Sequence, residues 1–142
     1  MRIENRTRKT LLGFDVKLVP GWWGRLRGYI GHNEPSPGQG ILLIPCDGVH
    51  TFWMRFDLDV VFLDDHGVVL EVIRSLKPWK WTRRVKGARS VLEMPAGMID
   101  RSGTEVGDRL AWWDPAPAPV SELIGNRKRW RSQFTAREGD NR

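Results

Sequence analysis

The stretch LDVVFLDDHGVVLEVIR, residues 58–74, decides the fold class of this sequence. Both of its halves are rich in β-branched side chains, which favour strands. Between them, DDHG at residues 64–67 combines aspartates, which suit the first positions of a turn, with a glycine that adopts positive φ without strain. The stretch therefore predicts an antiparallel β-hairpin with strands at 58–63 and 68–74.

Further short strands are expected on both sides of this hairpin. Alternating side chains, or short apolar runs that end at a proline, occur in four more segments: residues 11–19, 41–44, 90–94 and 109–113. Residues 1–10 are polar and basic, and we expect a frayed arm or an edge strand there. Short helices are expected near residues 20–30 and 96–101. This pattern predicts a mainly β fold, an antiparallel β-sandwich or small barrel with one or two short helices.

The domain is expected to end where prolines alternate with alanines. The sequence DPAPAP, residues 114–119, favours an extended polyproline conformation, and its prolines cannot donate to a sheet. We therefore expect a single β domain at 1–114, followed by a Pro/Ala linker and a basic tail at 115–142. No apolar run reaches the roughly 18 residues of a membrane-spanning helix. With Cys46 as the single cysteine and no signal-like N-terminal segment, the expected location is the cytoplasm.

Charge is unevenly distributed along the 142 residues, whose formal net charge is +6. Residues 74–89 contain seven basic side chains and no acidic one, whereas residues 47–71 contain six acidic side chains and one arginine. We expect the two segments to form ion pairs with each other. Such pairing would leave less of the basic charge for an external partner.

Four segments resemble one known family: CDGVHTFWMRF at residues 46–56, LDVVFLD at 58–64, VLEMPAG at 91–97 and VGD at 106–108. In this order and spacing they are similar to the bacterial and archaeal family called domain of unknown function 192, also known as UPF-0127. The similarity covers residues 11–113. It implies a compact, mainly β, sandwich-like domain. It implies no reaction, cofactor or catalytic residue, because none is established for the family.

The first of these segments carries the candidate chemistry. A thiol beside an imidazole can become a nucleophile, so Cys46, His50 and Asp59 are the candidates for a small hydrolase or a thiol-dependent enzyme. The alternative is structural. Cys46 follows Pro45 at the end of an apolar strand, where we expect a buried side chain. Asp59 would then pair with Arg55 or cap a backbone turn.

The same segment also has the side chains of a binding surface. Aromatic rings and methionine can line an apolar pocket, and carboxylates two positions apart on a strand lie about 6–7 Å apart on one face. The expected ligand-binding residues are His50, Trp53, Met54, Asp57 and Asp59. We expect foremost a non-catalytic binding module for a small ligand or a protein partner, with its working surface around residues 46–59. We expect no cofactor, and no metal, because HxH, HExxH and CxxC spacings do not occur in the sequence.

A second alternative is nucleic-acid binding by the basic loop at residues 74–89. Tryptophans among lysines and arginines can stack on bases while the cations contact phosphates. The expected polyanion-binding residues are Lys77, Trp79, Lys80, Trp81, Arg83, Arg84 and Lys86. The sequence contains no recognised nucleic-acid motif, so this hypothesis ranks below the binding module. We expect a monomer or a weak homodimer.

Overall fold

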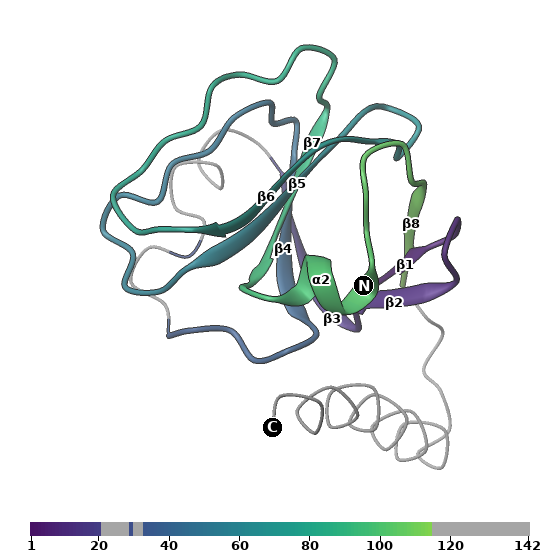
Figure 1. The fold of residues 1–142 in the computed structure, drawn as a ribbon, viewed down its shortest axis with the longest axis horizontal. Helices are drawn as coiled ribbons and strands as arrows, with labels where there is room; N and C mark the ends of the chain where they lie inside the picture. The colour runs from purple at the N-terminus through teal and green to yellow at the C-terminus, as the bar shows by residue number, and fades with distance from the viewer. Residues whose placement is uncertain (21–28, 30–32, 115–142) are drawn as a thin grey trace, which may run out of the picture.

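The computed structural model describes residues 1–20, 29 and 33–114 (Figure 1). This part of the chain forms strands and one short helix, in the order β1 (Arg2–Asn5), β2 (Thr10–Gly13), β3 (Asp15–Pro20), β4 (Gln39–Ile44), β5 (Leu58–Leu63), β6 (Val69–Leu76), β7 (Ser90–Pro95), α2 (Met98–Ser102) and β8 (Leu110–Trp113). The strands build a three-stranded sheet with the order β2-β1-β8 and a five-stranded sheet with the order β3-β4-β7-β5-β6. The prediction of a mainly β fold with little helix is confirmed.

The predicted hairpin is confirmed as β5 and β6, which pair antiparallel. Asp64 holds its turn, because Oδ1 accepts hydrogen bonds from the backbone N–H groups of His66 (2.8 Å) and Val68 (2.9 Å). These bonds, above all the one from Val68, favour the carboxylate and lower the pKa of Asp64. Gly67 has a φ of 78°, and a Cβ there would approach the Leu110 carbonyl oxygen to 2.5 Å. Glycine is therefore required at this corner.

The five-stranded sheet is mixed, which corrects the expectation of an antiparallel fold throughout. β3 and β4 run parallel, from Asp15 opposite Gln39 to Pro20 opposite Ile44. The other neighbours in this sheet pair antiparallel. Parallel neighbours need a long connection, and the chain between β3 and β4 is long enough for one. The side-chain pattern could not predict this, because alternation looks the same in both strand directions.

Residues 11–19, expected as one strand, belong to two strands in different sheets. β2 ends at Gly13 and β3 begins two residues later. A Cβ at Gly13 would come within 2.5 Å of the Val16 side chain and within 3.2 Å of the Gly38 carbonyl oxygen. The chain therefore passes from one sheet to the other at a point where only glycine fits the close approach.

Residues 1–10 form neither the frayed arm nor the edge strand expected from their polar sequence. β1 is the middle strand of the three-stranded sheet, and its Ile3 and Asn5 side chains are buried. The Asn5 amide donates hydrogen bonds to Thr104 (3.2 Å) and to Asp108 (2.8 Å). A buried amide with such partners is tolerated inside a protein. Composition, which counts asparagine as polar, could not reveal this.

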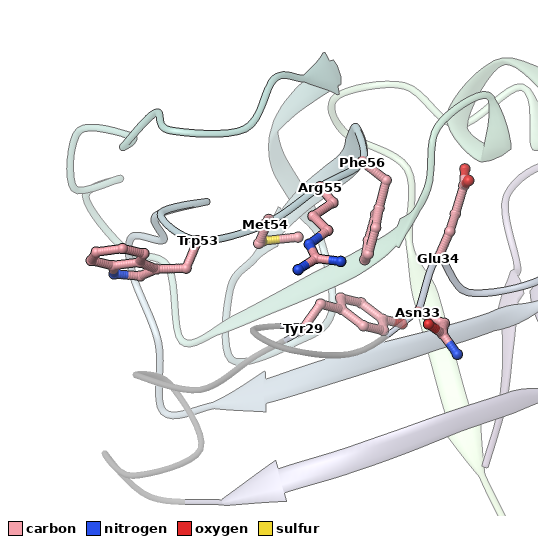
Figure 2. Close-up of a pocket in the computed structure, with 7 residues that line it drawn as sticks. All are labelled: Tyr29, Asn33, Glu34, Trp53, Met54, Arg55 and Phe56. Atoms are coloured by element: carbon pink, nitrogen blue, oxygen red, sulfur yellow. The ribbon is translucent and has the colours of Figure 1, made fainter.

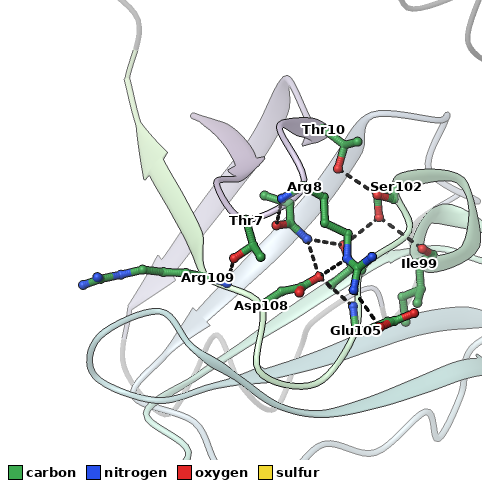
Figure 3. A network of polar contacts seen from close by, with 10 residues as sticks. Thr7, Arg8, Thr10, Ile99, Ser102, Glu105, Asp108 and Arg109 are labelled. Atoms are coloured by element: carbon green, nitrogen blue, oxygen red, sulfur yellow. Dashed lines mark hydrogen bonds and ion pairs between the residues drawn. The ribbon is translucent and has the colours of Figure 1, made fainter.

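Asp108 is the centre of a polar network between the β1–β2 turn and the segment before β8 (Figure 3). Its carboxylate accepts hydrogen bonds from Arg8 Nε (2.7 Å), from Asn5 and from the Glu105 N–H (2.9 Å). Arg8 also pairs with the Glu105 carboxylate at 2.6 Å. Burial alone would raise the pKa of Asp108, but these hydrogen bonds outweigh it and lower the pKa. The network thus connects the first hairpin to the strand that completes its sheet.

Two hydrophobic clusters lie on opposite faces of the five-stranded sheet. Along β5, Val61 and Leu63 belong to the cluster shared with the three-stranded sheet, whereas Val60 and Phe62 belong to the cluster on the other face. In Figure 1 the three-stranded sheet lies on one side of the five-stranded sheet, and long loops lie on the other. The first cluster joins the two sheets in a sandwich-like arrangement. Loops cover the second cluster.

The helix expected near residues 96–101 is α2, a single short helix. The Asp59 carboxylate accepts a hydrogen bond from the Ile99 N–H at 2.8 Å, which satisfies one of the free donors at the start of α2. The helix expected near residues 20–30 falls largely outside the described residues, as does the tail at 115–142. The domain boundary predicted after residue 114 therefore stays a prediction.

Candidate functional site

Two loops cover the second hydrophobic cluster and are hydrogen-bonded to each other. They are residues 46–56, between β4 and β5, and residues 77–88, between β6 and β7, and both lie at one end of the molecule (left in Figure 1). Four backbone hydrogen bonds of 2.8–3.0 Å join them: Thr51 N–H to Lys80 O, Trp79 N–H to Thr51 O, Thr82 N–H to Val49 O, and Val85 N–H to Asp47 O. We call this unit the paired loops.

Thr51 clamps the paired loops together. Its side chain is fully buried, and Oγ1 donates a hydrogen bond to the Lys77 carbonyl (2.6 Å) and accepts one from the Lys80 N–H (2.9 Å). Sequence reasoning missed this residue. Its signal was the His-Thr pair within residues 46–56, but a hydroxyl that bonds only to backbone groups cannot be recognised from spacing.

Cys46 and Asp59 lie on opposite faces of the five-stranded sheet. Cys46 is buried in the cluster beneath the paired loops, and its thiol donates a hydrogen bond to the Gly48 carbonyl at 3.2 Å. Asp59 is buried on the face of Val61, where it accepts hydrogen bonds from the Ser75 N–H at 2.9 Å and from α2. Asp59 therefore caps backbone groups, one of its two expected structural roles. The candidate catalytic residues do not converge on one site, because the sheet separates the thiol from this carboxylate.

An aromatic cluster forms the surface of the paired loops. The His50 ring stacks on Phe52 with centroids 5.1 Å apart, and Phe52 contacts Trp79 (6.2 Å) and Trp81 (6.0 Å). Trp53 packs edge-to-face on Trp79 at 4.7 Å. The three tryptophans are 67%, 55% and 73% exposed in the order Trp53, Trp79, Trp81. The tryptophans of this cluster are therefore largely open to solvent, whereas His50 and Phe52 are half-buried.

Two of the exposed tryptophans have a left-handed backbone. The φ angle is 67° at Trp53 and 63° at Trp79. This conformation crowds the Cβ atom and costs a residue other than glycine roughly 1–2 kcal/mol. Glycine or asparagine would adopt it more readily. The paired loops thus present two large apolar side chains to solvent in spite of both backbone strain and the hydrophobic effect.

A pocket of about 260 Å³ opens beside the aromatic cluster (Figure 2). Its lining residues come from the loop 46–56 and from the chain that precedes β4: Tyr29, Asn33, Glu34, Trp53, Met54, Arg55 and Phe56. Figure 2 shows the Arg55 side chain extending toward Tyr29, while the Glu34 carboxylate points away from the Arg55 guanidinium. Arg55 forms no ion pair with any residue that the structure describes.

The pocket contains part of the predicted binding surface. Trp53 and Met54 line it, whereas His50 belongs to the aromatic cluster, and neither Asp57 nor Asp59 reaches it. The residues from the chain before β4 were missed, because sequence spacing gives no sign that a distant segment folds beside this loop. The predicted pair of carboxylates is also divided: Asp57 pairs with a lysine at the surface, and Asp59 is buried.

Two titratable residues are buried beneath the paired loops. Tyr29 packs edge-to-face on Phe56 at 5.8 Å, and burial, with smaller effects of Glu93 and Asp15, raises its pKa. Glu93 lies on β7 opposite a residue of the second cluster on each neighbouring strand, and burial raises its pKa to about 7. Its Oε2 atom has no hydrogen-bond partner among the residues that the structure describes. The signal in the sequence was an acidic residue inside the otherwise apolar segment 91–97.

Much of the basic loop's charge is paired with the acidic segment, as the sequence predicts. Lys77 forms an ion pair with Asp57 at 2.5 Å. Two arginines of the loop also form ion pairs, Arg83 with Glu71 at 3.0 Å and Arg84 with Asp47 at 3.3 Å. Lys80 and Lys86 form no ion pair within the described part of the chain. The remaining positive charge on the paired loops is therefore carried chiefly by these lysines and by Arg55.

The described residues contain no group of three His, Cys, Asp or Glu side chains that could hold a metal ion. Within the same residues, no helix is long and apolar enough to cross a membrane.

The structure thus defines a mainly β domain in which two hydrogen-bonded loops form an aromatic surface, and one of them lines a pocket together with the chain before β4. The chain belongs to the DUF192 family, described as an uncharacterized ACR, whose model matches residues 3–112. A UPF0127 protein of Pyrococcus abyssi is 38% identical over 116 residues, which cover 78% of this chain and 96% of the relative. A UPF0127 protein of Thermococcus sibiricus is 28% identical over 130 residues, covering 84% of this chain and 82% of the relative.

Two solved structures share the fold. A protein of unknown function from Novosphingobium aromaticivorans superposes with a TM-score of 0.68 at 17% identity, covering 78% of this chain and 82% of its own. A protein from Sinorhizobium meliloti superposes with a TM-score of 0.66 at 21% identity, covering 78% of this chain and 89% of its own. At these identities the likeness concerns the fold alone.

Proposed function

We propose that this protein is a binding module for a small molecule that has an apolar ring and an anionic group. The observation that carries this proposal is the position of Arg55. Its guanidinium lies in a pocket with aromatic walls and has no ion pair among the described residues. Ligand sites typically combine apolar walls with a few polar groups that orient the ligand. A carboxylate or a similar planar anion is the group that a guanidinium binds best.

The walls and the size of the pocket support a small ligand. Trp53, Met54 and Phe56 come from one loop, which is hydrogen-bonded to its neighbour, and Tyr29 closes the opposite side (Figure 2). A volume of about 260 Å³ lies near the lower limit for ligand pockets. The ligand therefore has one or two rings. Preformed walls favour binding because little side-chain freedom is lost.

The separation of the thiol from Asp59 supports binding over catalysis by Cys46, His50 and Asp59. The enzyme alternative predicts a thiol that reacts rapidly with an alkylating reagent, whereas the burial of Cys46 predicts slow alkylation. Alkylation by iodoacetamide at neutral pH tests this, with the urea-unfolded protein as the fast reference and Cys46→Ser as the blank. Labelling of the native protein as fast as that of the unfolded protein would favour the enzyme.

We also propose a cytoplasmic location and a monomer or weak homodimer. Supporting the location is the single cysteine, which suits a reducing compartment. Size-exclusion chromatography with light scattering, over a range of protein concentrations, tests the oligomeric state.

The binding proposal is tested with a matched pair of probes, naphthalene-2-carboxylate and its neutral carboxamide. Titrations followed by tryptophan fluorescence and by amide chemical shifts should show tighter binding of the carboxylate. Shift changes should centre on residues 53–56. The Arg55→Met variant should bind both probes equally, because it keeps an apolar side chain and lacks the cation.

The matched control is Arg89→Met, which removes an exposed arginine outside the pocket lining. It should keep the preference for the carboxylate. Equal affinity of the wild-type protein for the two probes, or shift changes away from the pocket, would contradict the proposal.

A further inference from the structure

We propose that the aromatic cluster, together with Lys80, binds single-stranded nucleic acid by stacking on its bases. The cluster consists of His50, Phe52, Trp53, Trp79 and Trp81, and it is a surface distinct from the pocket, with which it shares only Trp53. This inference goes beyond the small-molecule site and does not depend on it.

The first argument is that the cluster is built for contact with a partner. More than half of the surface of each tryptophan is exposed. Monomeric proteins seldom expose contiguous apolar groups of this kind unless they bind something there. Trp53 and Trp79 also adopt left-handed φ angles, which are unfavourable for bulky side chains. Strain of this kind is typical of functional sites.

The second argument is that the rings are held in place. Backbone hydrogen bonds join the two loops directly at Thr51, Trp79 and Lys80. The buried Thr51 hydroxyl adds bonds to the Lys77 carbonyl and the Lys80 N–H. A surface whose rings are fixed before binding loses little entropy when a planar partner stacks on it.

The third argument is charge. Lys80 lies in sequence between two of the exposed tryptophans, Trp79 and Trp81, and has no ion pair in the described part of the chain. The acidic neighbours Asp57, Glu71 and Asp47 are already paired with basic residues of the same loop. The aromatic cluster therefore combines stacking surfaces with an uncompensated cation, the arrangement that binds bases and phosphates without sequence preference.

The type of apolar side chain favours nucleic acid over a lipid surface. The large, exposed apolar residues of the paired loops are all tryptophans, whereas exposed aliphatic residues such as Leu18 and Val106 lie elsewhere. Protein segments that bind at a bilayer surface usually combine aromatic with aliphatic side chains. Stacking on bases needs aromatic rings alone.

The test is fluorescence anisotropy of a labelled oligouridylate of about 12 nucleotides, titrated with the full chain at several salt concentrations. Binding at low salt should weaken as salt rises. Trp79→Gly should lower the affinity at least about fivefold and leave the salt slope unchanged. Glycine is chosen because it accepts the left-handed backbone at this position. Lys80→Ala should instead reduce the salt slope by about 0.7, the value for one phosphate contact on a single strand.

Lys17→Ala and Trp113→Ala are the matched controls, since Lys17 lies on β3 and Trp113 on β8, outside the paired loops, and both variants should bind as the wild type does. Circular dichroism verifies that each variant is folded. Absence of binding at low salt overturns the proposal, as does unchanged affinity of a folded Trp79→Gly protein. A second assay uses vesicles of phosphatidylserine and phosphatidylcholine, and binding to these vesicles without binding to the oligonucleotide would assign the surface to a membrane. Arg55→Met, which tests the pocket, leaves all of the cluster's rings in place, so the two proposals fail separately.

Discussion

At the scale of single residues, Glu93 is a buried acid whose pKa differs strongly from its ordinary value. It lies on a central strand and is 3% exposed, and one of its carboxyl oxygens has no hydrogen-bond partner in the described part of the chain. A buried carboxylate without a partner is costly, so the group resists ionisation instead. This explains why burial raises its pKa to about 7. The protein therefore contains an acid that changes charge near neutral pH.

Glu93 makes stability depend on pH between about 4.5 and 7. In this window the unfolded chain has lost the proton, whereas the folded protein retains it, so stability falls as pH rises and stays low above 7. The full effect is on the order of 3 kcal/mol. We predict that Glu93→Gln removes this part of the pH dependence and is more stable than the wild type at pH 8. Urea unfolding at pH 5 and pH 8 measures the free energy of unfolding of the wild type and of the variant. If stability changed with pH by the same amount in the two proteins, the prediction would be wrong.

At the scale of elements, the sequence predicts strands well and their partners poorly. β5, β6 and β7 were predictable because each has an apolar pattern of the right length. The middle position of β1 was not, since it depends on Asn5 meeting partners about a hundred residues away. For the candidate site, Trp53 and Met54 were identified by residue type. The role of Thr51 and the approach of Tyr29 depend on contacts between distant segments, which no local pattern encodes.

The paired loops should lose stability when the Thr51 hydroxyl is removed. Thr51→Val keeps the shape of the buried side chain but leaves the Lys77 carbonyl and the Lys80 N–H, which lie at part-buried positions, without this partner. We expect a loss of about 1–3 kcal/mol in urea unfolding. Thr82→Val is the control, since within the described residues the half-buried Thr82 Oγ1 accepts a single hydrogen bond, from the Val49 N–H at 3.0 Å. Equal losses in the free energy of unfolding would show that Thr51 contributes no more to the stability of the paired loops than Thr82 does.

The connection between the first hairpin and β8 should depend on Asp108. Asp108→Asn removes the charge that pairs with Arg8 in a buried position, and we expect a loss of about 2 kcal/mol. Because the pKa of Asp108 is lowered by folding, its contribution is complete above the ordinary carboxyl pKa of about 4 and is lost as the pH falls below it. Glu105→Gln, which alters the exposed partner of Arg8, should cost below about 1 kcal/mol. Thermal unfolding at pH 7 compares the two. A larger effect at Glu105 would be inconsistent with this account.

At the scale of the whole molecule, one five-stranded sheet serves two purposes. One face packs on the three-stranded sheet and stabilises the fold, and the other supports the paired loops. The hydrophobic residues of both described clusters lie within the first 112 residues, and the family match also ends at residue 112. The segment from residue 115 onward is outside this match.

We therefore predict that truncation after Asp114 leaves the domain folded. The melting temperature should change by no more than about 2 °C, because the described clusters remain complete. Differential scanning calorimetry of the full and truncated chains tests this. A fall of 10 °C or more would show that residues 115–142 belong to the core.

The position of β1 has a consequence for how the chain folds during synthesis. β1 precedes the other described strands, yet it lies between β2 and β8, with Arg2 opposite Trp113. A nascent chain can pair β1 with β2 early, but one edge of β1 stays unpaired until β8 has left the ribosome. Contacts of such long sequence separation form slowly. For that interval the protein exposes an open strand edge, which is a site for misassembly and for chaperone binding.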